Sequence, residues 1–409
     1  MQLEPSAAWP ADGCVHVIGA GPVGLMLTAL LQSMQPLPIR LYERRAEYTR
    51  TRMVRLAPYL VADSLQSYWT DRLDGENIEA LFDRSDLEES LAFRQRMPSD
   101  LTALLRDWTQ GFCPLNHIER TLSDLIDRRP SNGVERVRTT LSAEDAMAML
   151  GPRDIVIDCT GARSLLRDHL VPEGAGVAGA NTDSFRLEHA IVVTFLFGRP
   201  YSCNELCKYY KNVENTAYKF IPAVERTAFD GEISHVTGIV AISEAEYDAM
   251  PAQFDGAWLR SHFPSVATSM DRFIVKIRQE TEGEIVGDLE IVRIPMNLYH
   301  ARNATSRKWR GPAGAGQPLA GAPAFLVGDS AIGSPYFQSI SLGFECAMYL
   351  AGLLAQRDLP LRDVLDRYEL LIYKQWLRVY MRSKMIKHNK DLFESLDDTM
   401  GLLGKLHIY

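Results

Sequence analysis

The stretch VHVIGAGPVGL, residues 15–25, decides the fold of this chain. Its first four residues are mostly apolar, which is typical of a buried strand, and three glycines follow at G-x-G-x-x-G spacing. A helix then opens at a proline, a residue favoured at the first helical position. Such a helix presents unpaired N–H groups and the positive end of its dipole to a phosphate. The stretch therefore predicts a dinucleotide site, against the alternative of an ordinary tight turn.

The residues of this predicted turn have separate tasks. Gly19 permits the tight turn, Gly21 lets the backbone approach a pyrophosphate, and Gly24 lets the helix pack closely on the strand. The helix that follows begins with Pro22 and Val23. We expect all five residues to line the dinucleotide.

A second short strand, residues 39–42, ends in Glu43, which comes 19 residues after the last glycine. A carboxylate at this place can accept a hydrogen bond from a ribose hydroxyl. The following stretch is rich in arginine, with Arg44, Arg45, Arg50, Arg52 and Arg55. Guanidinium groups match phosphate oxygens, so we expect at least one of them to contact the cofactor directly. The alternative is a solvated basic rim.

Length and composition allow two domains, or one large domain with an insertion. The chain has 409 residues, of which 46% are hydrophobic and 23% charged, as in a globular protein. Its net charge of −8 gives no general case for nucleic-acid binding. No run approaches the length of a membrane span, and the polar start does not resemble a signal peptide. Six scattered cysteines fit reduced thiols, so we expect a cytoplasmic protein without a metal site.

The rest of the chain predicts further pieces of the same domain. Residues 58–109 look mainly helical, residues 116–126 start a helix that carries Arg120, and residues 134–137 form a short strand. The run DIVIDCTGARSLLR, residues 154–167, predicts a buried strand that breaks into a turn. That turn holds Asp158 and Gly161, with Ser164 and Arg167 following at helical spacing.

From about residue 170 to residue 320 the pattern changes to alternating strands, including residues 185–198, 207–224, 234–242 and 273–295. This pattern predicts a mostly antiparallel sheet inserted between parts of the first domain. A linker rich in Gly, Ala and Pro, residues 311–323, marks its end. A four-residue apolar strand then leads into Gly328 and Asp329, and a helix is expected to start near Gly343.

The last predicted element is a long helix over residues 361–396. Its basic part, residues 377–390, is most simply a solvated or domain-packing face. A docking surface for an acidic partner is the alternative.

These pieces, in this order, resemble the single-component FAD-dependent monooxygenases of the aromatic hydroxylase type. The glycine turn with Glu43 matches their first fingerprint, and Arg120 matches an arginine on the helix beside the cofactor. The resemblance assigns Asp158 and Gly161 to a second fingerprint that serves flavin and reductant together. It assigns Asp329 to a third fingerprint, where the aspartate binds the ribityl chain, and it places Gly343 and Phe344 at a helix that points its N-terminus at the flavin ring.

The resemblance implies an α/β fold with a Rossmann-like FAD-binding domain, an inserted antiparallel substrate domain and C-terminal helices. The FAD-binding domain would comprise residues 1–169 and 321–409, and the substrate domain residues 170–320. NAD(P)H would be a transient reductant, because only one glycine fingerprint is present. The implied reaction uses O₂ and inserts one oxygen atom into a small organic substrate, an aromatic or polycyclic metabolite.

Residues 43–59 and 116–122 are also similar to the monooxygenase domain of the MICAL proteins, which oxidise protein methionines. This local similarity places Arg50, Thr51 and Arg52 where those relatives touch FAD. A protein substrate or partner is therefore possible but less favoured. The catalytic acid or base stays open: Tyr209, Tyr210, Tyr218, Lys219 and His300 are candidates, each more simply explained as ordinary sheet structure.

Three departures from the family pattern concern the flavin's electronics and the approach of the reductant. Ile332 stands where many aromatic hydroxylases have a histidine, Glu345 stands where many have a neutral residue, and Thr160 precedes Gly161 in place of the commoner aspartate. An FAD-dependent oxidase, dehydrogenase or cyclase without oxygen insertion is the main alternative. A halogenase is less favoured, because the chain has no W-x-W-x-I-P run and no lysine between Glu43 and Ser202. A binding protein with vestigial flavin is a further alternative.

Overall fold

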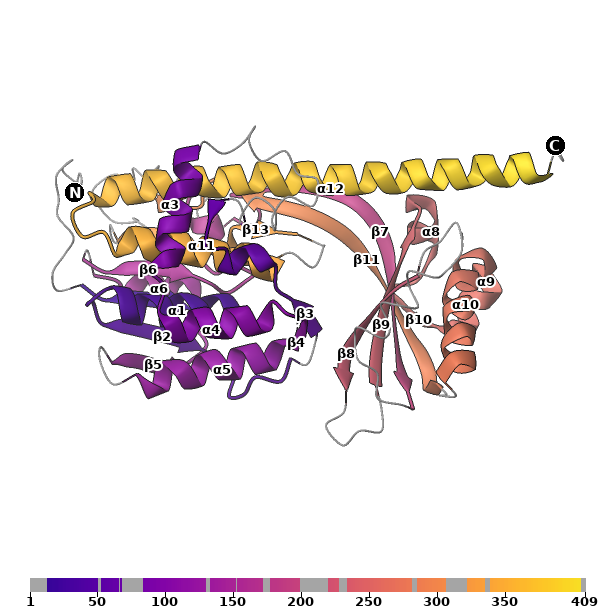
Figure 1. Cartoon of the computed structure of the whole chain (residues 1–409), viewed down its shortest axis with the longest axis horizontal. Helices are drawn as coiled ribbons and strands as arrows, with labels where there is room; N and C mark the ends of the chain where they lie inside the picture. The colour runs from indigo at the N-terminus through magenta and orange to yellow at the C-terminus, as the bar shows by residue number, and fades with distance from the viewer. Residues whose placement is uncertain are drawn as a thin grey trace. The chain divides into compact units, whose positions relative to one another are not determined.

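The computed structural model shows two units of structure, which are described separately (Figure 1). It describes residues 13–50, 53–65, 67, 84–129, 133–151, 153–171, 177–198, 220–227, 234–281, 285–306, 322–334 and 339–405. Unit 1 comprises Met1–Thr49, Arg55–Phe185 and Leu298–Val379. Unit 2 comprises Arg50–Val54, Arg186–Asn297 and Tyr380–Tyr409.

Unit 1 is built on a five-stranded parallel sheet in the order β12-β6-β1-β2-β5. The strands are β1 (Val15–Ile18), β2 (Ile39–Glu43), β5 (Val134–Arg138), β6 (Ile155–Asp158) and β12 (Ala324–Leu326). The central strand β1 is buried along its whole length, and Val15 pairs with Ile39 on one side and Ile155 on the other. The predicted strands at residues 39–42, 134–137 and 154–158 are confirmed.

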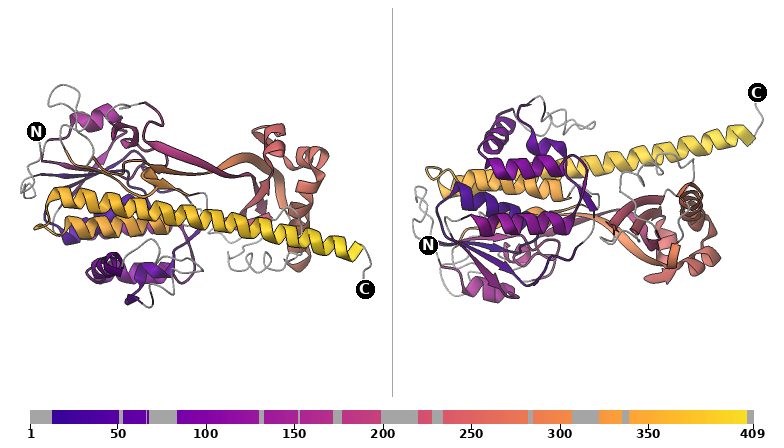
Figure 2. Two further views of the ribbon diagram at one scale, coloured as in Figure 1. Left: turned by 90° about the horizontal axis from the view of Figure 1, so that it is seen from above. Right: turned by 60° about the horizontal axis from the view of Figure 1, so that its bottom comes forward.

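Helices that are distant in the sequence pack together in unit 1. They include α1 (Pro22–Met34), α3 (Arg84–Gln95), α4 (Ser99–Trp108), α5 (Leu115–Arg128), α6 (Ala143–Ala148), α11 (Ser339–Leu354) and the part of α12 (Leu361–Lys405) that ends at Val379. Helix α1 packs against both α5 and α11. The first part of α12 runs beside α11 in both views of Figure 2. The predicted helices at residues 22–32, 116–126 and 361–396 are confirmed, whereas only part of the stretch 58–109 is described.

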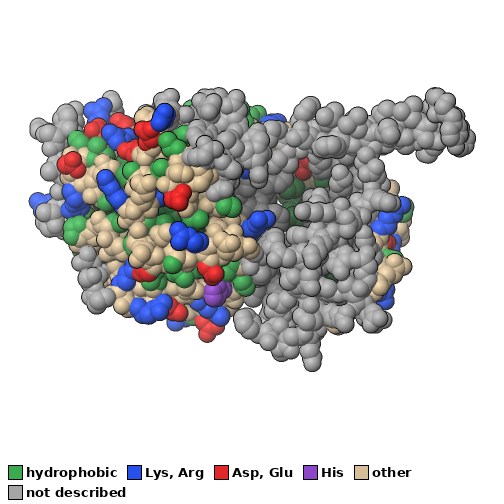
Figure 3. Space-filling view, viewed as in Figure 1, with side chains coloured by type: hydrophobic (Ala, Val, Ile, Leu, Met, Phe, Trp, Pro, Cys, Tyr) green, Lys and Arg blue, Asp and Glu red, His purple; other side chains and the backbone are tan. Residues whose placement is uncertain are grey.

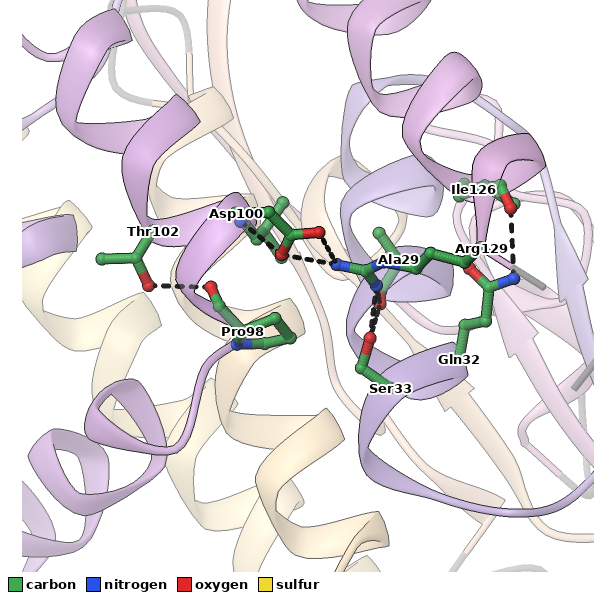
Figure 4. A network of polar contacts seen from close by, with 9 residues as sticks. Ala29, Gln32, Ser33, Pro98, Asp100, Thr102, Ile126 and Arg129 are labelled. Carbon is green, nitrogen blue, oxygen red and sulfur yellow. Dashed lines mark hydrogen bonds and ion pairs between the residues drawn. The ribbon is translucent and has the colours of Figure 1, made fainter. Parts of the chain in front are cut away.

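A polar network joins α1, α4 and the end of α5 (Figure 4). Arg129, which directly follows α5, donates from Nη2 to both carboxylate oxygens of Asp100 on α4, at 2.8 and 2.9 Å. Its Nη1 atom donates to the Ala29 carbonyl of α1 at 2.5 Å and to the Ser33 hydroxyl. One guanidinium thus satisfies acceptors on two other helices. It joins the later half of α1, the helix that follows the predicted dinucleotide turn, to α4.

Helix α3 docks on α11 through a close contact and a polar pair. The Phe93 ring lies where a side chain at Gly352 would begin, since a Cβ there would be 2.2 Å from Phe93 Cγ. The Tyr349 hydroxyl of α11 donates to Glu89 on α3 at 2.6 Å, and Arg367 donates to the same carboxylate at 2.9 Å. Gly352 is therefore needed for the approach of the two helices.

The second sheet has the order β10-β11-β7-β9-β8, and β13 also pairs with β11. Its strands are β7 (Thr182–Phe197), β8 (Phe220–Thr227), β9 (Ser234–Ile242), β10 (Gln253–Asp255), β11 (Ile285–Ala301) and β13 (Ile332–Gly333). The pairs β7–β9, β8–β9, β10–β11 and β11–β13 are antiparallel. The predicted fold class, a mixed α/β chain with a parallel sheet and a separate antiparallel sheet, is confirmed.

Unit 2 also contains helices that the strand pattern did not predict. They are α8 (Glu244–Ala249), α9 (Gly256–His262) and α10 (Pro264–Thr281). The prediction of a strand over residues 273–295 is wrong in its first third, because residues 273–281 belong to α10. Val266, Met270 and Ile274 of α10 are buried at a spacing of four, so one helical face packs where the β-branched residues suggested a strand.

No described helix is long and apolar enough to cross a membrane. On the face of unit 1 shown in Figure 3, positive and negative side chains are interspersed among uncharged ones. Among the described residues, no group of three or more His, Cys, Asp or Glu side chains could hold a metal ion.

The contact between Phe93 and Gly352 predicts that Gly352→Ala destabilises the protein. Alanine favours a helix over glycine, but its methyl group would overlap the Phe93 ring and force α3 away from α11. We expect a loss of about 1–3 kcal/mol in the free energy of unfolding, measured by chemical denaturation. Gly111→Ala is the matched control, because a Cβ at Gly111 would meet no heavy atom within 4 Å. Equal stability of Gly352→Ala and the parent would contradict the docking of α3.

Candidate functional site

The candidate site lies in unit 1, at the carboxyl ends of β1, β2, β6 and β12. From the central strand β1 the chain passes to β2 on one side, while β6 lies on the other side. Ligands of open parallel sheets bind in the crevice where the strand order reverses in this way. The turns after β1, β6 and β12 therefore meet at one edge of the sheet.

The glycine turn after β1 leaves no room for a side chain at Gly19 or Gly24. Gly19 has a φ of +98°, and a Cβ at this residue would lie 2.8 Å from the Cys159 carbonyl oxygen. A Cβ at Gly24 would lie 1.9 Å from the Gly19 carbonyl oxygen. Gly21 caps α1 without a side-chain hydrogen bond, and Pro22 is the first helical residue. Gly19 and Gly24 therefore pack on neighbouring backbone, and residues 21–23 at the start of α1 are partly exposed.

Val23 joins the first turn to the third. Its methyl groups lie 3.3 Å from a Cβ built at Gly328, and 2.6 Å from one built at Gly343. Gly343 therefore permits close packing of α1 on α11. The expectation that a helix starts near Gly343 is wrong, since α11 begins at Ser339 and Gly343 lies in its second turn. The neighbouring Phe344 is fully buried in α11.

Glu43, at the end of β2, is bound by Arg45. Its Oε1 accepts hydrogen bonds from Arg45 N and Nε at 2.9 and 3.1 Å, and its Oε2 accepts one from Arg45 Nη2 at 2.9 Å. Burial raises the pKa of Glu43, but the hydrogen bonds from Arg45 outweigh it, so the net shift is downward. Arg45 Nη2 also lies 3.7 Å from the buried Glu119 on α5. A carboxylate on each side keeps Arg45 at the strand end.

Arg120 is brought to the same place from α5. Its Nη2 donates to the Tyr48 carbonyl at 3.2 Å, and the Arg45 guanidinium lies 5.7 Å from the centre of the Tyr48 ring. Arg120 and Arg44 are exposed. The structure thus brings Arg45 and Arg120 together at Tyr48, while their contact with a cofactor stays a prediction. Arg50 is exposed and belongs to unit 2, and Arg52 lies outside the described residues.

Asp158, at the end of β6, is fully buried and holds the second turn together. Five hydrogen bonds reach its carboxylate, from Thr160 N (2.8 Å), Thr160 Oγ1 (2.6 Å), Ser164 Oγ (2.6 Å), Leu166 N (2.8 Å) and Ser330 Oγ (3.2 Å). These donors leave its side chain directed into the protein. Ser164 and Arg167 do not continue a helix at this turn, because only residues 167–169 form a short 3₁₀ turn.

The second turn is joined to the third through Ser330. Gly161 has a φ of +86°, and its N–H donates to Ser330 Oγ at 3.1 Å. Ser330 ends the short turn that begins at Gly328, where φ is +67°. Ser330 was not predicted as a site residue, although its hydroxyl directly follows Gly328-Asp329 in the sequence. Its partner Asp158 is 172 residues away, so no local pattern could reveal the bond.

Tyr299 is a second residue that the sequence analysis missed. Its hydroxyl donates to the backbone carbonyl of Asp329 at 2.8 Å. Burial, and then the charge of Asp329, raise the pKa of Tyr299 to about 12. The phenol therefore stays protonated and keeps its donor across the physiological pH range.

The other residues that the sequence singled out are mostly structural. His300 stacks on Trp376 with ring centres 4.1 Å apart and lies 3.7 Å from Asp183, and burial lowers its pKa. Ile332 is buried in β13. Glu345 is buried on α11 and lies 3.4 Å from both Arg94 and Arg378. Tyr209, Tyr210, Tyr218 and Lys219 lie outside the described residues.

Comparison with known proteins gives matches to solved structures alone. No protein-family model matches the chain, and no curated protein matches it. The Diels-Alderase PyrE3 in the biosynthetic pathway of pyrroindomycins has a TM-score of 0.49 and 15% identity, over 95% of this chain and 77% of that chain. CmlS, a flavin-dependent halogenase, has a TM-score of 0.48 and 14% identity, over 91% of this chain and 63% of CmlS. CabE, an aromatic hydroxylase from angucycline biosynthesis, has a TM-score of 0.45 and 15% identity, over 95% of this chain and 73% of CabE.

These scores are too low for the printed functions to be carried over, and this chain spans less than two thirds of CmlS. The comparisons do not show the similarity to the MICAL proteins, which stays a prediction. The assignment of the site therefore depends on the geometry of unit 1.

The bonds between Glu43 and Arg45 predict an acid-dependent stability. The pKa of Glu43 is lowered in the folded protein, so its contribution is present above the unfolded pKa of about 4.3 and is lost as the pH falls through the folded value. Glu43→Gln should be less stable than the parent at neutral pH and lose less stability on acidification. Urea denaturation at several pH values measures this. Glu135→Gln, which removes an exposed pair with Arg40, should change little. Parallel pH profiles for parent and Glu43→Gln would contradict the role of this pair.

Proposed function

We propose that the chain is an FAD-dependent monooxygenase that uses NAD(P)H and O₂ to insert one oxygen atom into an aromatic or polycyclic metabolite. The observation that carries the proposal is the turn after β1, where side chains are excluded at Gly19 and Gly24 beside a carboxylate at the end of β2. Backbone N–H groups at a helix start, next to such a carboxylate, suit a pyrophosphate joined to a ribose.

The residues of the first turn fit the adenosine diphosphate part of FAD. The first turn of α1 contains no acidic side chain that would repel a phosphate. Arg45 occupies three acceptor positions of Glu43, and a carboxylate has about four. The Arg44 backbone N–H also stabilises the charged form of Glu43, so a ribose hydroxyl would join or replace these donors when it binds. Arg120 and Arg44 are exposed, and a guanidinium such as that of Arg120, which gives one bond to the Tyr48 carbonyl, has further N–H donors for a phosphate. Arg50 and Arg52 remain candidates for the same role.

The second and third turns fit the remainder of the cofactor. Asp158 would act by shaping the turn that contains Gly161, because its own oxygens already accept five hydrogen bonds. Asp329 would accept hydrogen bonds from the ribityl chain. Gly343 and Phe344 would place α11 beside the flavin. FAD itself would supply the redox and oxygen chemistry, while the protein seats the ring, excludes water and orients the substrate.

The domain roles follow from this assignment. Residues 1–169 and 321–409 would bind FAD, and residues 170–320 would bind the substrate. NAD(P)H would bind transiently, since one glycine fingerprint is present. We propose a cytoplasmic enzyme that acts on a small molecule, without nucleic acid. Oxidation of a protein methionine is the less favoured substrate choice.

The proposal predicts a yellow protein whose FAD is released on denaturation. With NADPH and a metabolite panel, NADPH and O₂ should be consumed together with formation of an oxygenated product, detected by an oxygen electrode and mass spectrometry. Hydrogen peroxide as the sole product would indicate an oxidase, and product without NADPH would indicate a cyclase or dehydrogenase. A colourless protein that does not take up FAD would overturn the proposal.

Arg120 tests the architecture, because it reaches the site from α5. Arg120→Ala should weaken FAD binding by about 1.5–3 kcal/mol, since a charge-assisted hydrogen bond is lost. Lysine should restore only part of the affinity, because an ammonium lacks the guanidinium fork. Titration of apo-protein with FAD measures both. Arg128→Ala is the matched control, because Arg128 is exposed on the same helix and donates to the Asp124 carbonyl. FAD binding by Arg120→Ala equal to that of the control would remove α5 from the site.

A further inference from the structure

Two side chains from other segments of unit 1, Tyr299 and Arg167, hold the backbone of the turn that contains Asp329. Gly328 has a positive φ of +67°, so this turn has a backbone conformation that few residues favour. The backbone carbonyls of Asp329 and Ser330 both accept hydrogen bonds from side chains in other parts of unit 1. We propose that Tyr299 and Arg167 are positioning residues that aim the Asp329 carboxylate at the ribityl chain of FAD.

Tyr299 reaches the turn from the last residues of β11. Its backbone pairs with Gly333 of β13, and a Cβ at Gly333 would lie 2.0 Å from the Tyr299 ring. This contact fixes the ring, and the hydroxyl then donates to the Asp329 carbonyl at 2.8 Å. A phenylalanine would fill the same space, so the hydroxyl serves the carbonyl and not the packing.

Arg167 approaches the same turn from the short 3₁₀ turn, residues 167–169, that follows β6. Its guanidinium carbon lies 5.0 Å from the centre of the Tyr299 ring. Nη1 donates to the Ser330 carbonyl at 3.3 Å, and Nη2 donates to the Ala162 carbonyl at 2.9 Å. Its Nε is buried without a hydrogen-bond partner among the described residues. Burying an unsatisfied N–H destabilises the fold, so packing alone does not explain this side chain.

Tyr299 and Arg167 therefore act together on the turn that contains Asp329. Arg167 joins the second turn, through Ala162, to the third, through Ser330, and it stacks on the tyrosine that holds Asp329. With consecutive carbonyls fixed at Asp329 and Ser330, the peptide between them cannot rotate without breaking a hydrogen bond. Fixing that peptide sets the backbone ψ of Asp329, and with it the direction in which the Cα–Cβ bond leaves the turn. This inference rests on the proposed binding of FAD.

The first test is Tyr299→Phe, which removes the donor and keeps the ring. Titration of apo-protein with FAD should show a dissociation constant about two- to tenfold higher than that of the parent, the loss expected for one neutral hydrogen bond. Tyr349→Phe is the matched control, because the Tyr349 hydroxyl is bonded to Glu89 on α3 in the same unit. It should bind FAD like the parent. Thermal unfolding of each apo-protein shows whether both variants are folded.

A double-mutant cycle separates positioning from general support of the fold. If Tyr299 acts through Asp329, Tyr299→Phe should not weaken FAD binding further in an Asp329→Ala background. Asp329→Asn serves as the background if the alanine variant does not fold. The inference would be overturned if the losses of FAD binding free energy from the two substitutions were additive, or if Tyr299→Phe bound FAD as tightly as the parent. In both cases FAD binding by the parent would leave the proposed function standing. Failure of the parent to bind FAD would instead overturn the proposed function and the inference with it.

Discussion

The buried carboxylate of Asp158 is the constraint on which the site depends. A fully buried charge is costly unless hydrogen bonds satisfy it, and this one receives five from residues of the second and third turns. The requirement shapes both turns: Thr160 and Ser164 close the second turn, while Ser330 brings in the third. The Ser330 hydroxyl also accepts from Gly161 N, so loss of the carboxylate would release two turns together.

Glu345 shows a second way to satisfy a buried carboxylate in unit 1. It lies between two buried guanidinium groups, Arg94 from α3 and Arg378 from α12, each 3.4 Å away. Burial lowers the pKa of Arg94, whereas the charge of Glu345 raises it. Such a group of charges tolerates little change, because removing one member leaves another uncompensated. The negative charge of Glu345, at a position where many aromatic hydroxylases have a neutral residue, is therefore compensated by arginines on α3 and α12.

What the sequence could predict was local. The strand, glycine turn and helix at residues 15–34 follow from neighbouring residues, and the structure confirms them. The helix that was expected to start near Gly343 begins at Ser339, and Gly343 lies inside it in close contact with Val23, 320 residues away in the sequence. Helix α10 was misread because its β-branched residues suggest a strand, yet its buried face has helical spacing. The partners of Tyr299 and Ser330 were beyond prediction, because they lie in separate segments.

The site thus divides its residues into those that face a ligand and those that hold the facing residues. Glycines and backbone groups form the first turn, where a side chain at Gly19 or Gly24 would collide with the protein. Asp158, Ser330 and Tyr299 hold backbone that itself carries the ligand-facing groups. A motif search finds the residues that face the ligand, because their spacing along the chain defines them. Residues of the second class are found by asking where each buried carbonyl, hydroxyl and carboxylate has its partner.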